Sequence, residues 1–216
     1  MRSTHTIVLA HYGAVADESA TRERLLDAAE RLLAERGSAA TSVRDVLSAA
    51  GVANASAVGY YFGSKDGLVS AVERRAVEQV NEERSTGLGL LGPTPSLDAL
   101  VEAWVSPLVR LRCAGRGPAT ARVFMRIFEE PQEHWSSNGA NDVMEVGWRY
   151  LAASAPHLPG VDRHGLLWRW QSVTAVMAFY CHGYLEPFGA TSTPSDVDRH
   201  LGLLVPQGVA LLRAGT

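Results

Sequence analysis

Cysteine, lysine and long apolar runs are all scarce in this chain of 216 residues. Its two cysteines, Cys113 and Cys181, are too few for a disulfide framework or a cysteine-based zinc site. No apolar run reaches the roughly 18 residues that a membrane-spanning helix requires. A formal net charge of −3 excludes binding of nucleic acid through bulk positive charge. We therefore expect a globular protein with no metal, no cofactor and no membrane contact.

Lysine is nearly absent, because arginine supplies every basic residue except Lys65. We attribute this bias to genomic base composition. At the start of the chain, Arg2 precedes a short apolar stretch at 7–10 that is too short for the core of a signal peptide. We therefore expect residues 1–19 to form a loose or partly docked arm, and the protein to be cytoplasmic.

Strand patterns are also missing, since apolar and polar residues alternate nowhere over a useful length. Apolar residues at helical spacing predict a first helix over 21–36. Ser42, with Asp45 three residues later, is a capping signal for a second helix, which Gly51 should end. The fold class is therefore all-α.

Further capping and breaking signals divide the rest of the chain. Asn54 is expected to cap a very short third helix, and Ser64 a fourth that runs to about Arg84. The Gly- and Pro-rich stretch 86–95 predicts a linker. Longer helices are expected over 97–114, from 118 to before 131, over 141–155, over 163–186, and from a cap at Ser195 onward.

A helix, a glycine turn and a short helix over 43–62 have the spacing of a helix-turn-helix, whose second helix enters the major groove of DNA. We expect Asn54, Ser56 and Ala57 to face the bases, because small or hydrogen-bonding side chains allow close approach, and Ala57 can meet a thymine methyl. The paired titratable groups that a catalytic site needs are missing from this stretch. We therefore predict a protein that binds double-stranded DNA and is not an enzyme.

Phosphate contacts must depend on placement, because residues 20–66 hold equal numbers of acidic and basic side chains. Lys65 begins the fourth helix, where free N–H groups and the helix dipole already favour a phosphate. The expected phosphate contacts are Thr41, Ser42, Arg44, Tyr60, Tyr61 and Lys65. Simple capping, ion pairing, core packing or solvation remains an alternative role for each.

Several segments of the first third of the chain form one pattern: the run from Thr21 to Glu30, Gly37, the run from Thr41 to Val46, Ala50-Gly-Val, and Tyr60-Tyr-Phe-Gly-Ser-Lys-Asp-Gly-Leu68. Together these segments resemble the DNA-binding domain of the tetracycline-repressor (TetR) family. The resemblance implies a three-helix DNA-binding domain over 20–66. It also implies that a fourth helix joins this domain to a larger effector-binding and dimerisation bundle over 67–216. Gly59 departs from the family, which often has tyrosine there.

The resemblance also implies an effector cavity among the helices that start near 97, 118, 141 and 163. Its expected lining is Trp104, Met125, Phe128, Trp148, Trp168 and Gln171, with Arg126, His134 and His182 as further polar groups. The last two helices are apolar on more than one face, which pairing with a second copy would cover. The expected dimer interface is Trp170, Thr174, Met177, Cys181, Leu201, Leu204 and Leu212.

We therefore predict a ligand-responsive transcriptional regulator. We expect a homodimeric repressor that binds a palindromic operator and is released by a small molecule. One alternative is a helical ligand-binding or adaptor protein with impaired DNA binding, which the departure at Gly59 leaves open. The other is an all-helical enzyme that would use Glu129, Glu130, Glu133 or His134.

Overall fold

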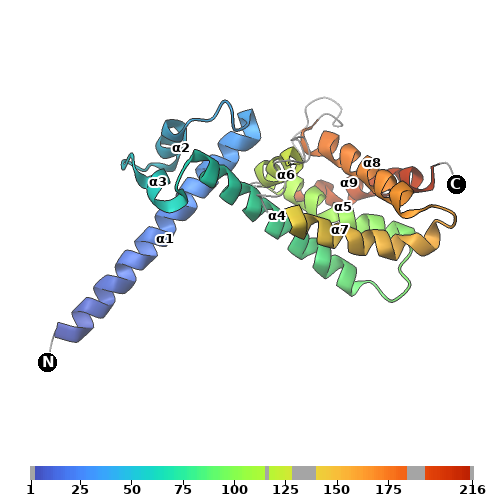
Figure 1. Ribbon diagram of the computed structural model, residues 1–216, viewed down its shortest axis with the longest axis horizontal. Helices are drawn as coiled ribbons and strands as arrows, with labels where there is room; N and C mark the ends of the chain where they lie inside the picture. Colours follow the sequence, from blue (N-terminus) through green and yellow to red (C-terminus); the bar gives the residue numbers. More distant parts are fainter. Residues whose placement is uncertain (1–2, 115–116, 128–139, 184–192, 215–216) are drawn as a thin grey trace. The chain divides into compact units, whose positions relative to one another are not determined.

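The computed structural model describes residues 3–114, 117–127, 140–183 and 193–214, and this described part contains helices and no strand. The helices are α1 (Ser3–Arg36), α2 (Val43–Ala50), α3 (Ala57–Phe62), α4 (Lys65–Leu90), α5 (Leu97–Cys113), α6 (Gly117–Arg126), α7 (Ala140–Ser154), α8 (Arg163–Cys181) and α9 (Val197–Arg213) (Figure 1). Two short 3-10 turns, η2 (Ala155–His157) and η4 (Pro194–Asp196), complete the list. The all-α prediction is confirmed.

The chain divides into two compact units, Met1–Val72 and Glu73–Thr216, and the division falls within α4. In the smaller unit α1 packs against α2, and α2 packs against α3. Leu25, Val46, Val58 and Leu68 supply its core, each no more than 2% exposed. Because each short helix buries only one or two side chains, the three helices depend on one another for stability.

The second helix begins and ends as its sequence predicts. Ser42 and Asp45 form a reciprocal capping box, in which each side chain accepts the other residue's backbone N–H. At the other end Gly51 takes a left-handed conformation with φ of 64°, and its N–H donates to the carbonyl oxygen of Ser48. Glycine adopts this conformation without the steric cost that a β-carbon brings.

Two predictions in the smaller unit are wrong. The first helix begins at Ser3 and not near residue 21, because no proline interrupts 3–36 and the glycine at position 13 costs a helix only about 1 kcal/mol. The third helix begins at Ala57, and Asn54 does not cap it. Instead the Asn54 carboxamide oxygen accepts from the Ser56 N–H at 3.0 Å, in a turn that precedes the helix.

The larger unit is organised around α5, which packs against α6, α7, α8 and α9 (Figure 1). Ser96 caps this helix by accepting the N–H of Ala99. Leu100, Val101, Leu108 and Val109 are 0% exposed, so α5 is buried on nearly every side. A helix that is apolar all round belongs in the centre of a bundle.

Element boundaries in the larger unit differ from the prediction in three places. The expected linker over 86–95 is helical as far as Leu90, and Gly87 lies close to Ala103 of α5, so packing keeps this glycine in the helix. The helix expected to reach residue 186 ends at Cys181. The segment before α9 is capped by Thr193 with Asp196, and not by Ser195. Within the described ranges, no helix is long and apolar enough to cross a membrane.

Candidate functional site

The short helix α3 and the turn before it present a small-residue surface to solvent. Asn54, Ser56, Gly59 and Tyr60 are all exposed, and Tyr60 is 72% exposed. The Asn54 carboxamide oxygen also accepts from the Ser56 hydroxyl at 2.8 Å, so these two polar groups are held together at the surface. Hydrogen-bonding groups on a short exposed helix are what base-edge recognition requires.

Ala57 does not share this surface, and its prediction as a base contact is corrected. It is 3% exposed and Val58 is 2% exposed, because both side chains turn toward the core of the smaller unit. A methyl group in that position does not reach a thymine. Helical periodicity alone could not separate Ala57 from its exposed neighbours, since α3 is only 6 residues long.

Thr41 is also buried, with 3% of its surface exposed. Its hydroxyl donates to the carbonyl oxygen of Gly37 at 2.7 Å, which satisfies an acceptor at the end of α1. The expected phosphate contact of Thr41 is therefore also corrected. The side chain closes the turn between α1 and α2 instead.

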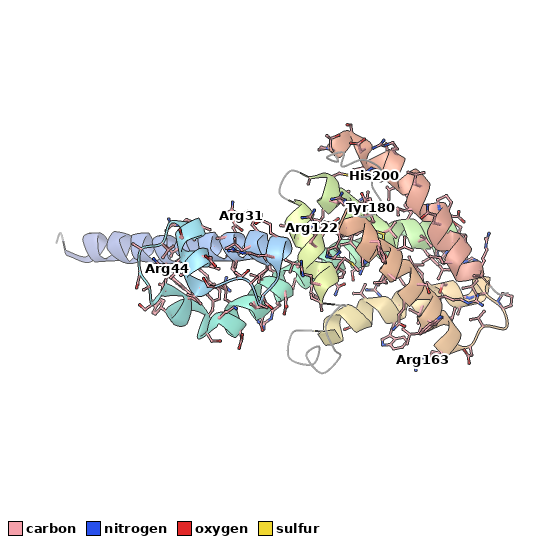
Figure 2. The ribbon with its side chains drawn as sticks, turned by 90° about the horizontal axis from the view of Figure 1, so that it is seen from above. Arg31, Arg44, Arg122, Arg163, Tyr180 and His200 are labelled. Carbon is pink, nitrogen blue, oxygen red and sulfur yellow. The ribbon has the colours of Figure 1, made fainter. Side chains whose placement is uncertain are left out.

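The start of α2 carries both an N-cap and an exposed arginine. The Ser42 hydroxyl donates to an Asp45 carboxylate oxygen at 2.7 Å, and Arg36 pairs with the same carboxylate at 3.3 Å. The Ser42 hydrogen bonds hold the pKa of Asp45 below its usual value. Arg44 is exposed beside them (Figure 2). The helix start therefore combines backbone N–H groups with a solvent-facing guanidinium.

The first residues of α4 belong to the same smaller unit. Lys65 donates from Nζ to the carbonyl oxygen of Ser38 at 2.7 Å and is half-buried. Ser64 caps the helix by accepting the N–H of Gly67 at 3.0 Å, as predicted. A β-carbon on Gly67 would lie 2.0 Å from the carbonyl oxygen of Phe62, so only glycine allows this tight junction between α3 and α4.

Helix α1 adds residues that the sequence analysis missed. The Tyr60 hydroxyl donates to the Glu18 carboxylate at 2.5 Å, and this hydrogen bond raises the pKa of Tyr60. An open groove of about 560 Å³ lies between α1 and the α3 segment. It is lined by Glu18, Thr21, Arg24, Gly51, Val52, Ala53, Asn54, Ala57, Tyr60 and Tyr61. No local pattern could pair Glu18 with Tyr60, because they are 42 residues apart.

Two family models match the chain over these elements. Residues 25–72 match the model for bacterial regulatory proteins of the tetR family, and residues 102–210 match the tetracyclin repressor-like C-terminal domain. The second match alone covers half of the chain. This chain belongs to the TetR family. The TetR match confirms the family that the sequence resembles, its helix-turn-helix DNA-binding domain and its role in transcription regulation; proteins of this family are generally not enzymes.

Solved structures share the fold at low sequence identity. A bacterial regulatory protein of the tetR family from Rhodococcus RHA1 is 17% identical with a TM-score of 0.63, covering 86% of this chain and 95% of its own. KstR2, a ketosteroid transcriptional regulator of Mycobacterium tuberculosis, is 16% identical with a TM-score of 0.58, covering 86% and 93%. AibR, solved with isovaleryl coenzyme A and operator DNA, is 16% identical with a TM-score of 0.61, covering 86% and 98%. No curated protein matches the chain.

The predicted effector lining is only partly brought together. Trp104 and Met125 are buried in the bundle, whereas Trp168 is 69% exposed and Gln171 is exposed, so neither of the last two lines an interior cavity. Trp148 is half-buried and lies under the Arg163 guanidinium, 4.1 Å from its ring centre. Phe128 and His134 lie outside the described residues. The two exposed side chains, Trp168 and Gln171, lie on the outer face of α8. This face could not be recognised from the sequence, because α8 is apolar on more than one face.

The interior holds a polar cluster that the sequence analysis missed. Arg84 of α4 is 1% exposed, and its guanidinium stacks on the Trp104 ring with the central carbon 3.5 Å from the ring centre. Its Nε donates to the Trp104 carbonyl oxygen at 3.0 Å, and the Tyr150 hydroxyl donates to the Arg84 carbonyl oxygen at 2.8 Å. Burial lowers the pKa of Arg84 to about 9 and raises that of Tyr150 to about 12. The only signal in the sequence was arginine in register with the apolar face of α4.

Most of the residues predicted to form the dimer interface are buried within their own chain. Five of them leave little or no surface for a partner: Trp170, Met177, Cys181, Leu204 and Leu212. Thr174 is half-buried and donates to the Trp170 carbonyl oxygen, and Leu201 is half-buried. The exposed large apolar side chains of α8 and α9 are Trp168, Phe179 and Leu203. Both faces of α8 are apolar in sequence, so the buried one could not be identified without its neighbours.

A second buried cluster joins α5, α8 and α9. The Tyr180 hydroxyl lies 2.7 Å from Nδ1 of His200, and the Cys113 sulfur lies 3.6 Å from the same nitrogen (Figure 2). Burial raises the pKa of Cys181 to about 12, so this thiol stays protonated. Among the described residues no group of histidine, cysteine and carboxylate side chains could hold a metal ion.

Proposed function

We propose that this TetR-family chain is a ligand-responsive repressor that binds operator DNA through α3 and releases it when a small molecule binds. The observation that carries the proposal is the exposed polar surface of Asn54, Ser56, Gly59 and Tyr60 on the short helix within the family match. These side chains are small or carry hydrogen-bonding groups, as reading base edges requires.

Individual roles follow from position and exposure. Asn54 and Ser56 read base edges, since both are exposed at the start of the short helix. Ser42, Arg44, Tyr60, Tyr61 and Lys65 contact phosphates, and so set the register of the protein on the duplex. Lys65 does so while keeping its hydrogen bond to the Ser38 carbonyl oxygen, since an ammonium group has three donors. Ser42 has a single O–H donor, so it contacts a phosphate by turning that donor away from the Asp45 carboxylate.

A second copy of the chain completes the DNA-binding form. Trp168 and Phe179 lie on one exposed stripe of α8 with Gln171 and Ala175, and Leu203 lies on the exposed stripe of α9. Soluble proteins rarely leave large apolar side chains grouped on a surface without function. A two-fold pair through these stripes supplies two copies of α3, and a palindromic operator has the same two-fold symmetry, with half-sites about 34 Å apart.

The effector belongs to the larger unit, which matches the C-terminal domain of the family. It changes DNA binding only if its affinity differs between the DNA-bound and the released forms. Helix α4 supplies Lys65 to one unit and Arg84 to the other, so it is the covalent path between them. We place this activity in the cytoplasm, where operator DNA is accessible.

Fluorescence anisotropy with the duplex DNA upstream of the protein's own gene tests the proposal. We expect saturable binding at low salt, lost in the double variant Asn54→Ala and Ser56→Ala but retained in the exposed control Arg213→Ala. Equal binding of all three proteins would contradict base reading by α3. A wild-type protein that ignores every fragment at low salt would favour the adaptor alternative.

A further inference from the structure

The buried side of α4 contains more hydrogen-bond donors than the described residues satisfy. Arg84 Nη1, Trp104 Nε1 and both polar atoms of the Asn81 side chain are buried and have no hydrogen-bond partner. Arg84, Trp104 and Asn81 are 1%, 6% and 7% exposed. A buried polar group without a partner is destabilising, so three neighbouring residues with this defect need an explanation.

The residues that carry these groups lie on α4 and on α5, which contact each other through Arg84 and Trp104. Asn81 and Arg84 are one turn apart on the same face of α4. The Arg84 guanidinium carbon lies 3.5 Å from the centre of the Trp104 ring, so the guanidinium and the indole, each with an unpartnered N–H, are in contact. The Phe124 ring closes another side at 5.2 Å from the guanidinium carbon. The result is a positive, donor-rich edge with aromatic walls.

The cluster of Arg84, Trp104 and Asn81 also carries the positive charge of the Arg84 guanidinium. Arg84 makes no ion pair with any carboxylate of the described residues. A buried charge without a partner is strongly destabilising, and burial accordingly lowers the pKa of Arg84. An anion that bound beside the guanidinium would offset this cost, because the charge-assisted hydrogen bonds it accepts are the strong ones.

We propose that Arg84, Trp104 and Asn81 form the polar end of the effector site, and that the effector is an organic carboxylate with an apolar body. A planar carboxylate matches the edge of a guanidinium and can also accept from the indole and carboxamide N–H groups. One cation balances one negative charge, which favours a carboxylate over a doubly charged phosphate. The rings of Trp104, Phe124 and Tyr150 suit an acyl or aryl body.

This inference rests on the proposed function for its regulatory meaning, but its test does not need DNA. Isothermal titration calorimetry of the full chain with sodium octanoate and sodium benzoate measures binding directly. Octanamide and benzamide are the neutral controls, because they keep the shape and lose the charge. We expect at least one acid to bind saturably and about tenfold or more tightly than its amide, as charge-assisted hydrogen bonds would require.

Variants separate recognition from a purely structural role of the arginine. Arg84→Met removes the charge, and Trp104→Phe keeps a ring but removes the indole N–H. We expect each to weaken binding of the acid severalfold or more while leaving binding of the amide unchanged. Arg163→Met is the matched control, since it makes the same change at an exposed arginine (Figure 2) that lies over the half-buried Trp148 ring. If Arg84→Met does not fold, Trp104→Phe and Asn81→Leu carry the same test.

Four outcomes overturn the inference: no saturable binding of either acid, equal binding of acid and amide, unchanged binding in the variants that fold, or binding of inorganic phosphate as tightly as the acids. The proposed function is judged separately. DNA binding by the wild-type chain without acid-selective binding overturns the carboxylate site alone, whereas acid-selective binding without DNA binding supports the site and contradicts the repressor.

Discussion

Single side chains at the surface of the smaller unit decide how strongly it can hold DNA. The unit has no excess of basic residues over 20–66, so each cation counts according to its place. Arg44 is exposed at the start of α2, and Lys65 is half-buried at the start of α4. Glu18 opposes them, because its carboxylate lies at the groove that Tyr60 and Asn54 line.

Replacing Lys65 with alanine should weaken binding to every DNA sequence alike. Loss of one phosphate contact lowers the slope of log K against log salt by roughly one unit. Anisotropy titrations across a salt series measure this slope.

Lys65 also donates to the Ser38 carbonyl oxygen, so its loss can loosen the turn after α1. Arg44→Ala is therefore made in parallel, because Arg44 is exposed and its removal spares that turn. A thermal melt shows whether either variant remains folded. An unchanged slope in a folded variant removes that residue from the DNA contacts.

Replacing Glu18 with glutamine should tighten DNA binding severalfold at low salt. The change removes a negative charge close to the phosphates and weakens the acceptor that holds the Tyr60 hydroxyl. The gain should fade as salt rises, because exposed charges are screened. Glu35→Gln on the same helix is the control, and an equal effect of the two changes would show that only net charge matters.

At the scale of elements, short helices depend on their ends. Helix α2 has 8 residues and buries only Val46 fully. Its capping box and its left-handed Gly51 therefore fix where the helix begins and ends. Helix α3 is shorter still and ends where Gly67 allows the chain to pass close to Phe62. These junctions place the exposed face of α3 outward.

Replacing Ser42 with alanine should lower the free energy of unfolding by about 1 kcal/mol, the usual cost of losing an N-cap. Urea unfolding followed by circular dichroism measures the change. Ser48→Ala, exposed in the middle of α2, is the matched control and should be neutral or slightly stabilising because alanine favours helices.

The effect of the Ser42 change should depend on pH. Ser42 lowers the pKa of Asp45, so this part of the stability is present above the unfolded value of about 3.9 and is lost as pH falls through the lower folded value. The difference between wild type and variant should therefore shrink in acid. A difference that grows below pH 4 would contradict this role of the capping box.

At the scale of the whole molecule, the exposed apolar side chains of α8 and α9 bear on how two chains would pair. The apolar stripes of α8 and α9 are exposed, whereas the core behind them is already filled by Trp170, Met177 and Leu212. We therefore propose that a second copy packs on Trp168, Phe179 and Leu203, and that the buried residues support these two helices.

Replacing Leu203 with aspartate should convert a dimer to a monomer, because a charge would be buried in an apolar interface. Light scattering after size exclusion at micromolar concentration measures the mass. Leu90→Asp makes the same change at a leucine that is 81% exposed on α4 and should remain dimeric. A wild-type protein that is already monomeric would remove this interface.

Local sequence patterns were enough to predict the helical class, several helix ends and the family of this protein. The helical class, the capping box at Ser42 and the turn at Gly51 depend on groups a few residues apart, and local hydrogen bonds and allowed backbone angles settle them. The family resemblance likewise rested on contiguous segments around Thr41 and Tyr60. These features would be read the same way from any chain with those segments.

The burial of individual side chains and the pairing of distant residues depended on contacts between distant segments. Ala57 and Trp170 are buried and Trp168 is exposed, although nothing local distinguishes them, because burial depends on which helices pack beside each face. The pairing of Glu18 with Tyr60 and the stacking of Arg84 on Trp104 join residues far apart in the chain. Such partners become neighbours only when the helices have packed, so these two pairings could be found only in three dimensions.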